Sequence, residues 1–186
     1  MRTLFASLLA AFGSIICAEA EAPAPITAAE VCFTLAMQDC AGFAVAAIDA
    51  ARSSLLVQAY NFTEPRIVAA VIAAHRRGIN VEVIVDKITA RQRGEGVDAV
   101  AAAGIPTFVD RMPRIAHNKV MVIDGETVLT GSFNWSVSAE RYNAENLLAV
   151  RSAALAGYYT ANFDRRRAAS VSYAPAAAAP TQEDGE

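Results

Sequence analysis

The residues of this chain best suited to chemistry lie at positions 115–134, where the sequence reads IAHNKVMVIDGETVLTGSFN. His117 and Lys119 are two positions apart, so on an extended backbone both side chains point to the same face. An imidazole is a base or nucleophile near neutral pH, and a lysine ammonium is a compact cation. Ser132 and Asn134 add hydrogen-bond donors a few residues later. A base, a cation and several donors together suit a phosphate diester.

A predicted β-hairpin positions these groups. The apolar run at residues 120–123 follows Lys119 directly and is typical of a buried strand, and a second β-rich run covers residues 127–130. Asp124-Gly125 joins the two runs, and this dipeptide favours a type I′ turn because both central residues of that turn need positive φ. The turn accounts for Asp124 without catalysis. We therefore expect Asp124 to organise the hairpin and not to contact phosphate.

The chain has only two histidines, so their roles can be compared directly. His75 falls in the last turn of an expected helix, where the helix dipole and solvent are enough to explain it. His117 taken alone would be explained as a core histidine. Its spacing from Lys119, Ser132 and Asn134 instead favours a functional interpretation.

These residues also match a known pattern. His-x-Lys, four further residues and Asp, with Gly-Ser-x-Asn a few residues later, resembles the HKD motif of the phospholipase D superfamily. The matching residues here are His117, Lys119, Asp124, Gly131, Ser132 and Asn134. The stretch from about residue 31 to residue 167 resembles the small single-motif bacterial endonucleases of that superfamily.

The resemblance implies a two-step displacement through a phosphohistidine. One histidine attacks phosphorus, and a second protonates the leaving oxygen and later activates water. Lys119, Ser132 and Asn134 would offset the phosphate charge in place of a metal ion, and no cofactor is implied. Glu145, in the segment NAEN at residues 143–146, resembles the acid that holds the tautomer of the histidine. A solvated residue at the start of a strand is an equal alternative for Glu145.

The implied mechanism needs two histidines, whereas this chain has one HKD motif and no second His-x-Lys. Family members with two motifs build the site inside one chain. A single-motif chain is expected to build it from two copies related by a two-fold axis. We therefore expect a homodimer in which both His117 side chains face each other across the interface.

Three functions are compatible with the motif. The first is an exported, metal-independent endonuclease that cleaves DNA, and alternatively RNA, with little sequence preference. The second is a phospholipase D or phosphatidyltransferase acting on phospholipids, although such enzymes usually carry two motifs on a much longer chain. The third is a non-catalytic nucleic-acid-binding protein, and the complete set of motif residues argues against it.

Composition bounds these alternatives only weakly. The 186 residues carry a net charge of −3, which does not indicate a nucleic-acid substrate. Arg91, Arg93, Arg111 and Arg114 flank the motif, but charge alone favours an ordinary solvated surface for them. No apolar stretch reaches the roughly 20 residues needed to span a bilayer. Residues 1–20 are expected to be removed as an export signal, and we expect no stable membrane insertion of the remaining chain.

The N-terminus is typical of an export signal, with a positive start at Met1-Arg2, an apolar run at residues 4–16 and a small-x-small site at residues 18–20. Cleavage would leave Cys32 and Cys40, an even pair that favours a disulfide in an oxidising compartment. Two buried thiols are the alternative. The expected location is the periplasm or the exterior of the cell.

Strand and helix patterns alternate through the rest of the chain. Strands are expected at residues 31–34, 54–60, 81–85, 106–110 and 145–150, and helices at residues 41–52, 65–77, 91–103 and 153–167. This alternation favours one α/β domain, a mixed β-sheet sandwiched between helices on both faces. The expected organisation is a signal peptide at 1–20, a linker at 21–30, a phospholipase D-like nuclease domain at 31–167 and a disordered tail at 168–186.

Overall fold

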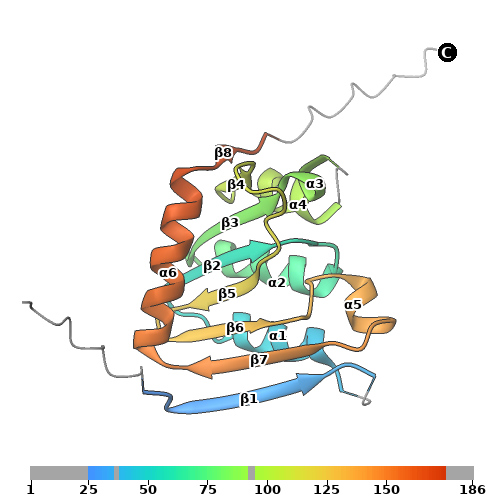
Figure 1. The fold of residues 1–186 in the computed structure, drawn as a ribbon, viewed down its shortest axis with the longest axis vertical. Coiled ribbons are helices and arrows are strands. Elements are labelled where there is room, and N and C mark those ends of the chain that lie inside the picture. The colour runs from blue at the N-terminus through green and yellow to red at the C-terminus, as the bar shows by residue number, and fades with distance from the viewer. Residues whose placement is uncertain (1–24, 36–37, 92–94, 175–186) are drawn as a thin grey trace, which may run out of the picture.

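A computed structural model of the protein describes residues 25–35, 38–91 and 95–174. At its centre is an eight-stranded sheet in the order β1-β7-β6-β5-β2-β3-β4-β8 (Figure 1). The strands are β1 (Ala28–Phe33), β2 (Ser54–Ala59), β3 (Asn80–Asp86), β4 (Thr107–Asp110), β5 (Lys119–Ile123), β6 (Thr127–Gly131), β7 (Asn146–Arg151) and β8 (Val171–Ser172). Strands β2, β3 and β4 run parallel and the other neighbours pair antiparallel, so the sheet is mixed.

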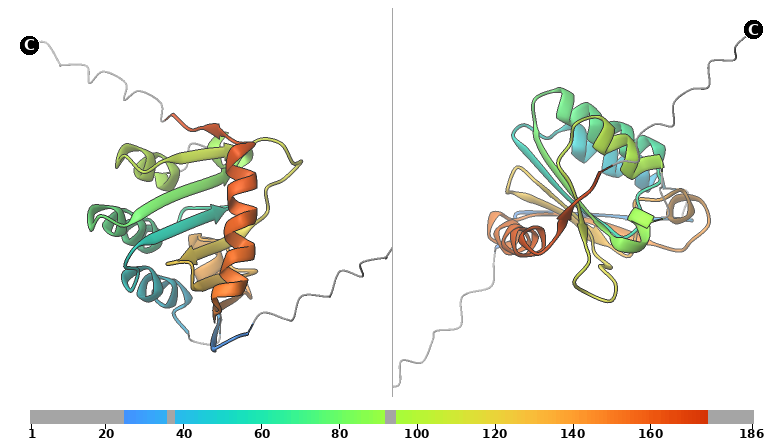
Figure 2. Two further views of the ribbon diagram at one scale, coloured as in Figure 1. Left: turned by 90° about the vertical axis from the view of Figure 1, so that its left-hand side faces the viewer. Right: turned by 90° about the horizontal axis from the view of Figure 1, so that it is seen from above.

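Helices cover both faces of this sheet. They are α1 (Cys40–Asp49), α2 (Pro65–Arg76), α3 (Lys87–Arg91), α4 (Glu95–Ala102), α5 (Val137–Arg141) and α6 (Ala153–Ala168). Figure 2 shows α6 on one face and α1, α2 and α4 on the opposite face. The predicted fold class, one α/β domain with a mixed sheet between helices, is confirmed.

The side chains of β5 show how the two faces are filled. Every residue of β5 is buried, because helices cover the sheet on both sides. Met121 belongs to the large core on the side of α1 and α2, whereas Val120 and Val122 pack with Ala156 of α6. The two-residue period of a strand places Lys119 on the same face as Met121. The cation of the motif therefore lies at the end of a buried strand.

The predicted hairpin is also confirmed. Asp124 and Gly125 have φ values of 55° and 65°, the positive values that a type I′ turn requires at both central positions. The Glu126 N–H donates a hydrogen bond to the Ile123 carbonyl (3.0 Å) and closes the turn. Strands β5 and β6 then pair in an antiparallel register.

Several short segments differ from the expectation. The helix expected at residues 91–103 corresponds to α4, which is described from Glu95 to Ala102, whereas α3 was not expected and begins at Lys87, directly after β3. The Asp86 side chain explains the early start, since its Oδ1 accepts a hydrogen bond from the Ile88 N–H (2.7 Å). Elements as short as α5 and β8 leave no periodic signal in a sequence.

The sheet extends beyond the domain limits expected from the sequence. Strand β1 begins at Ala28, before the limit at residue 31, and β8 lies after the limit at residue 167. The expected signal peptide at residues 1–20 lies outside the described residues, as do residues 175–186 of the expected tail. Among the described residues, no helix is both long enough and apolar enough to cross a bilayer.

Candidate active site

His117, Lys119 and Ser132 of the motif lie at one edge of the sheet, where β2 and β3 end and β5 begins. His117 precedes β5 and Lys119 is its first residue. The Tyr60 N–H donates a hydrogen bond to the Asn118 carbonyl (3.1 Å), so the end of β2 holds the backbone between the two motif residues. Ser132 follows the last residue of β6, Gly131, and completes this edge of the site.

His117 and Lys119 contact each other directly. The Lys119 Nζ lies 2.9 Å from Nδ1 and 3.1 Å from Nε2 of His117, and it donates a hydrogen bond to the His117 carbonyl (2.9 Å). The imidazole is exposed, whereas Lys119 is only 7% exposed. Burial lowers the pKa of Lys119, and the negative charge of Glu145 opposes this by raising it. The site thus pairs an accessible imidazole with a buried cation.

Tyr60 packs against both His117 and Lys119. Its ring centroid is 4.4 Å from that of His117, with the rings tilted by 54°. The Lys119 Nζ lies 5.0 Å from the Tyr60 centroid, within the range of a cation–π interaction. The sequence alone predicts no functional role for Tyr60. Its place directly after β2 is a usable signal, because site residues in α/β sheets gather at the carboxyl ends of the parallel strands.

Asp86, at the end of β3, holds the loop that leads into His117. This carboxylate is fully buried, and its Oδ2 accepts a hydrogen bond from the Ala116 N–H (2.6 Å) while Oδ1 caps α3. The neighbouring Lys87 Nζ donates to the Pro113 carbonyl (2.9 Å) in the same loop. Asp86 was also missed by sequence reasoning, and it fixes α3 and His117 relative to each other.

Ser132 lies where β6 meets the start of β7. Its Oγ accepts hydrogen bonds from the Asn146 N–H (3.1 Å) and from the Asn146 Nδ2 (3.3 Å), which leaves its own hydroxyl proton free to donate. Gly131 is required beside it, because a Cβ there would lie 2.3 Å from the Asn146 carbonyl oxygen. Among the described residues, Asn134 Oδ1 is one of the buried side-chain atoms without a hydrogen-bond partner.

Glu145 lies just before β7. Its Oε1 accepts a hydrogen bond from the Asn143 Nδ2 (3.0 Å), and its charge acts on Lys119. Within the described residues, no hydrogen bond joins Glu145 to His117, whose ring contacts Lys119 instead. The negative charge of Glu145 therefore acts on the cation of the motif and raises the pKa of Lys119.

Asp124 lies just past the opposite end of β5 from Lys119, five residues and roughly 16 Å away at 3.3 Å per residue. Its carboxylate accepts hydrogen bonds from the Ser53 N–H (2.8 Å), the Ser53 Oγ (2.9 Å), the Ser54 N–H (3.0 Å) and the Arg52 N–H (3.0 Å). Burial alone would raise the pKa of Asp124, but these donors outweigh it and hold the pKa below its usual value. The carboxylate ties the hairpin to the start of β2, away from His117.

The other histidine lies far from this edge. His75 is half-buried near the end of α2, the helix that connects the end of β2 to the start of β3. Because β2 and β3 are parallel, the end of α2 lies at the edge of the sheet opposite His117. Among the described residues, no group of three or more His, Cys, Asp or Glu side chains is arranged to hold a metal ion.

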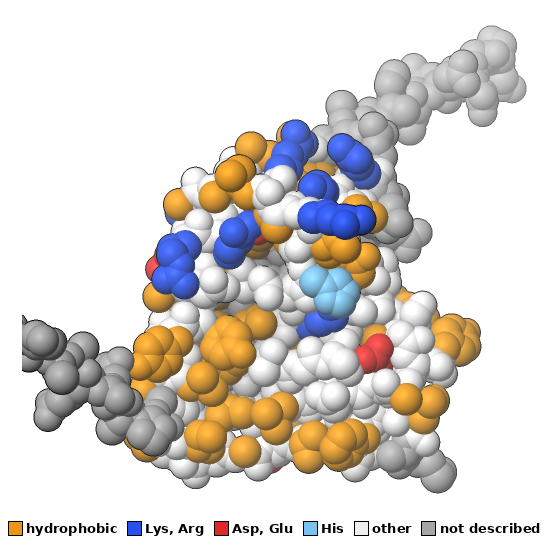
Figure 3. Space-filling view, viewed as in Figure 1, with side chains coloured by type: hydrophobic (Ala, Val, Ile, Leu, Met, Phe, Trp, Pro, Cys, Tyr) orange, Lys and Arg blue, Asp and Glu red, His pale blue; other side chains and the backbone are white. Residues whose placement is uncertain are grey.

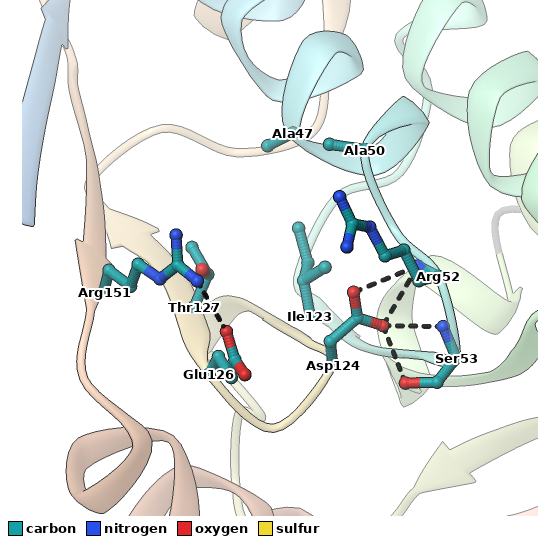
Figure 4. Close-up of a pocket in the computed structure, with 9 residues that line it drawn as sticks. All are labelled: Ala47, Ala50, Arg52, Ser53, Ile123, Asp124, Glu126, Thr127 and Arg151. Carbon is teal, nitrogen blue, oxygen red and sulfur yellow. Dashed lines mark hydrogen bonds and ion pairs between the residues drawn. The ribbon is translucent and has the colours of Figure 1, made fainter.

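Two cavities differ in charge. One of about 580 Å³ lies at the end of the sheet beside α3 and β8, and its lining includes the cationic residues Lys87, Arg91 and Arg111 and no acidic residue. Figure 3 shows Lys and Arg side chains gathered over one part of the face that also exposes a histidine. The other cavity, of about 490 Å³, is lined by Arg52 and Arg151 but also by Asp124 and Glu126 (Figure 4). Only the first of these two cavities carries an excess of positive charge.

Comparisons with known proteins agree on a family. The family described as "Cardiolipin synthase, PLD-like domain" matches residues 44–167, about two thirds of the chain. A phospholipase D of Rickettsia bellii is 38% identical over 137 residues, which cover 74% of this chain and 68% of the relative. A mitochondrial cardiolipin hydrolase of Xenopus tropicalis is 34% identical over 115 residues, which cover 62% of this chain and 55% of the relative.

A solved structure agrees with the sequence comparisons. Nuc from Salmonella typhimurium, a phospholipase D family member, superposes with a TM-score of 0.73 at 31% identity, covering 78% of this chain and 99% of Nuc. Family match, relatives and fold point the same way, and the chain belongs to the phospholipase D superfamily.

Proposed function

We propose that this protein is an exported phosphodiesterase that hydrolyses DNA without a metal ion, through a phosphohistidine formed on His117. The observation that carries the proposal is the contact of the exposed His117 ring with the buried Lys119 ammonium. The Lys119 Nζ lies within hydrogen-bond distance of both ring nitrogens, and because an ammonium only donates, it bonds to whichever nitrogen the tautomer leaves without a proton. A substrate phosphate would draw the ammonium onto its own oxygens and free this nitrogen to attack.

The reaction takes two steps. In the first, a His117 nitrogen bonds to phosphorus, the bond to one ester oxygen breaks, and that oxygen leaves with a proton from a second imidazole. In the second, water attacks phosphorus and gives its proton to the second imidazole as the phosphorus–nitrogen bond breaks. Lys119, Ser132 and Asn134 offset the charge on the phosphate oxygens. Glu145 favours the charged form of Lys119, and the family resemblance implies that it would also orient His117.

The second imidazole comes from a second copy of the chain. The described part of one chain brings His117 alone to this edge, because His75 lies at the opposite edge of the sheet. A two-fold axis through the site would place two His117 rings on opposite sides of one phosphate. Met112 and Ile115, 73% and 44% exposed in the loop that precedes His117, offer apolar surface for that contact.

Local charge supports nucleic acid over phospholipid as the substrate. The cavity lined by Lys87, Arg91 and Arg111 suits a chain of phosphates that continues away from the cleaved bond. Asp86 fixes the helix that carries Lys87 and Arg91 to the residue before His117. Phospholipid is the second candidate, because relatives of this chain carry the names phospholipase D and cardiolipin hydrolase.

Export is supported by the N-terminal sequence and by the pairing of the two cysteines that lie after the expected signal peptide. Cys32 and Cys40 form a disulfide in the structure, as the sequence predicts for an oxidising compartment. The proposed location is the periplasm or the exterior of the cell.

One assay tests the proposal. The purified protein is incubated with plasmid DNA, RNA and phosphatidylcholine vesicles, each with and without EDTA. We expect DNA cleavage that EDTA does not reduce, loss of cleavage in His117→Ala, and near-normal cleavage in the matched control His75→Ala. Loss of cleavage in EDTA would reject the metal-independent mechanism, and turnover of phosphatidylcholine without DNA cleavage would make phospholipid the substrate.

A further inference from the structure

The turn after β1 reaches the candidate active site from a distant part of the sequence. Thr34 is 5% exposed, and its Oγ1 donates a hydrogen bond to the Asn143 carbonyl (2.6 Å) and accepts one from the Glu145 N–H (2.7 Å). The Thr34 N–H also donates to the Glu145 carbonyl (3.1 Å). A residue 111 positions away thus holds both backbone polar groups of Glu145.

The same hydroxyl controls the donor that binds the Glu145 carboxylate. Asn143 Nδ2 donates to Glu145 Oε1 (3.0 Å), and the Asn143 carbonyl is the acceptor for Thr34 Oγ1. Thr34 therefore holds the backbone of Glu145 and the backbone of Asn143, the residue whose side chain binds the Glu145 carboxylate. A side chain of the same shape without the oxygen would leave a carbonyl and an N–H without their partner at this buried position.

A disulfide closes the segment that carries Thr34. Cys32, two residues before it, is bonded to Cys40, the first residue of α1, eight positions along the chain. Within this loop the Phe33 N–H donates to Gln38 Oε1 (2.6 Å). The Cys32–Cys40 bond thus limits how far Thr34 can move away from Glu145.

We propose that Thr34 is a positioning residue for Glu145, and that the Cys32–Cys40 disulfide makes this positioning sensitive to reduction. The proposal rests on the proposed function through the role of Glu145 at Lys119. Reduction breaks the sulfur–sulfur bond and adds one hydrogen to each sulfur, while a dithiol such as dithiothreitol is oxidised to its cyclic disulfide. The freed segment then holds Glu145 less firmly, and the negative charge that acts on Lys119 is displaced.

The direction of the effect follows from the charges. Glu145 raises the pKa of Lys119 against the effect of burial. A displaced carboxylate supports the ammonium less, so Lys119 loses its proton at lower pH, and the alkaline limb of the pH–activity profile moves to lower pH. The turnover number falls as well, by roughly 10- to 100-fold for a displacement near 1 Å.

A pair of buried threonines provides the test. Thr34→Val is compared with Thr34→Ser, which keeps the hydroxyl, and with Thr107→Val as the matched control. Thr107 is also 5% exposed, and its hydroxyl donates to the Ile105 carbonyl (2.9 Å), away from Glu145. We expect Thr34→Val to shift the alkaline limb and lower kcat, Thr34→Ser to restore both, and Thr107→Val to lower thermal stability without moving the profile.

A double-mutant cycle separates positioning from general damage. In a Glu145→Gln background, Thr34→Val should move the alkaline limb no further, because the charge that it positions is absent. An equal further shift would overturn the proposal, as would a Thr34→Val profile that superimposes on that of the parent protein. If the parent protein itself cleaves no phosphodiester, the proposed function fails instead, so the two failures are distinguishable.

Reduction provides an arm that needs no Thr34 variant and stands even if Thr34→Val does not fold. Dithiothreitol should move the alkaline limb of the parent protein to lower pH. The variant Cys32→Ala/Cys40→Ala should show the shifted limb already and should not respond to the dithiol. A parent protein whose profile is the same before and after complete reduction would overturn the redox part of the proposal.

Discussion

The Lys119 Nζ lies 2.9 Å from the Nδ1 of His117 and also 2.9 Å from the His117 carbonyl oxygen. A cation is thus held beneath an exposed imidazole at the end of a buried strand. Burying an ammonium costs free energy, which the fold has to offset elsewhere. Such a cost is expected where a buried charge is needed for the reaction. A mutation of Lys119 should therefore affect activity and stability differently.

Changing Lys119→Met should remove activity without weakening the fold. We expect kcat to fall by about 100- to 1000-fold, the usual effect of removing one group that stabilises charge in the transition state. The melting temperature should stay the same or rise, because the apolar side chain avoids the desolvation cost of the ammonium. Steady-state kinetics and thermal unfolding measure the two effects. A variant that loses both activity and several degrees of melting temperature would contradict this separation.

Changing Glu145→Gln should shift the pH dependence of activity. Burial lowers the pKa of Lys119 and the Glu145 charge raises it, so removing that charge lowers the Lys119 pKa further. Lys119 then loses its proton at lower pH, and the alkaline limb of the kcat profile moves to lower pH. Glu126→Gln is the matched control, because Glu126 pairs with Arg151 (3.0 Å) near the far end of β5. A profile unchanged in Glu145→Gln would rule out this electrostatic support.

Changing Asp124→Asn should reduce stability and not the chemistry of each folded molecule. Asn tolerates the positive φ of this turn, so the change mainly weakens the bonds to residues 52–54. We expect a loss of about 1–3 kcal/mol in the free energy of unfolding at neutral pH. The folded pKa of Asp124 is lowered, so its stabilisation is present above the unfolded pKa of about 3.9 and is lost as the pH falls through the folded value.

Urea unfolding between pH 7 and pH 3 checks this prediction. The difference between Asp124→Asn and the parent protein should shrink at the acid end of the range. Normal stability combined with loss of kcat in Asp124→Asn would instead assign the residue to the chemistry.

Removing the two arginines of the cationic cavity should weaken cleavage of long substrates most. For Arg91→Ala/Arg111→Ala we expect the ratio of kcat/KM for DNA to kcat/KM for bis(p-nitrophenyl) phosphate to fall by roughly 10-fold or more. The salt dependence of DNA binding should also become less steep. Arg52→Ala/Arg76→Ala removes two exposed arginines at the other edge of the sheet and is the matched control. An equal fall of the ratio in both pairs would mean that net charge alone is responsible.

Mixed dimers should reveal whether the site is shared. A tagged His117→Ala chain is co-expressed with an untagged parent chain, and dimers containing one of each are isolated. Because each site would then have one histidine in place of two, we expect the mixed dimers to be almost inactive. Dimers that keep about half of the parent activity would show that each chain carries a complete site.

Local signals in the sequence explain what could be predicted. The β5–β6 hairpin could be predicted because the Asp124-Gly125 turn depends only on residues next to each other in the chain. The contact of His117 with Lys119 could be predicted for the same reason, from their two-residue spacing. Tyr60, Asp86 and Thr34 were missed as site residues, because they reach the motif only through contacts between distant segments. No periodic pattern encodes such contacts.

The pairing of β1 with β7 has a consequence for the order in which the molecule is made. Phe33 pairs with Asn146 and Ala28 with Arg151. The first strand of the chain, β1, therefore has no neighbour in the sheet until β7 has formed. Val31 and Phe33 stay exposed even then, and an unpaired apolar edge is prone to aggregate during synthesis. Thr34 meets Glu145 only when that edge closes. The contact between Thr34 and Glu145 is therefore expected to form late in folding, after β1 and β7 have paired.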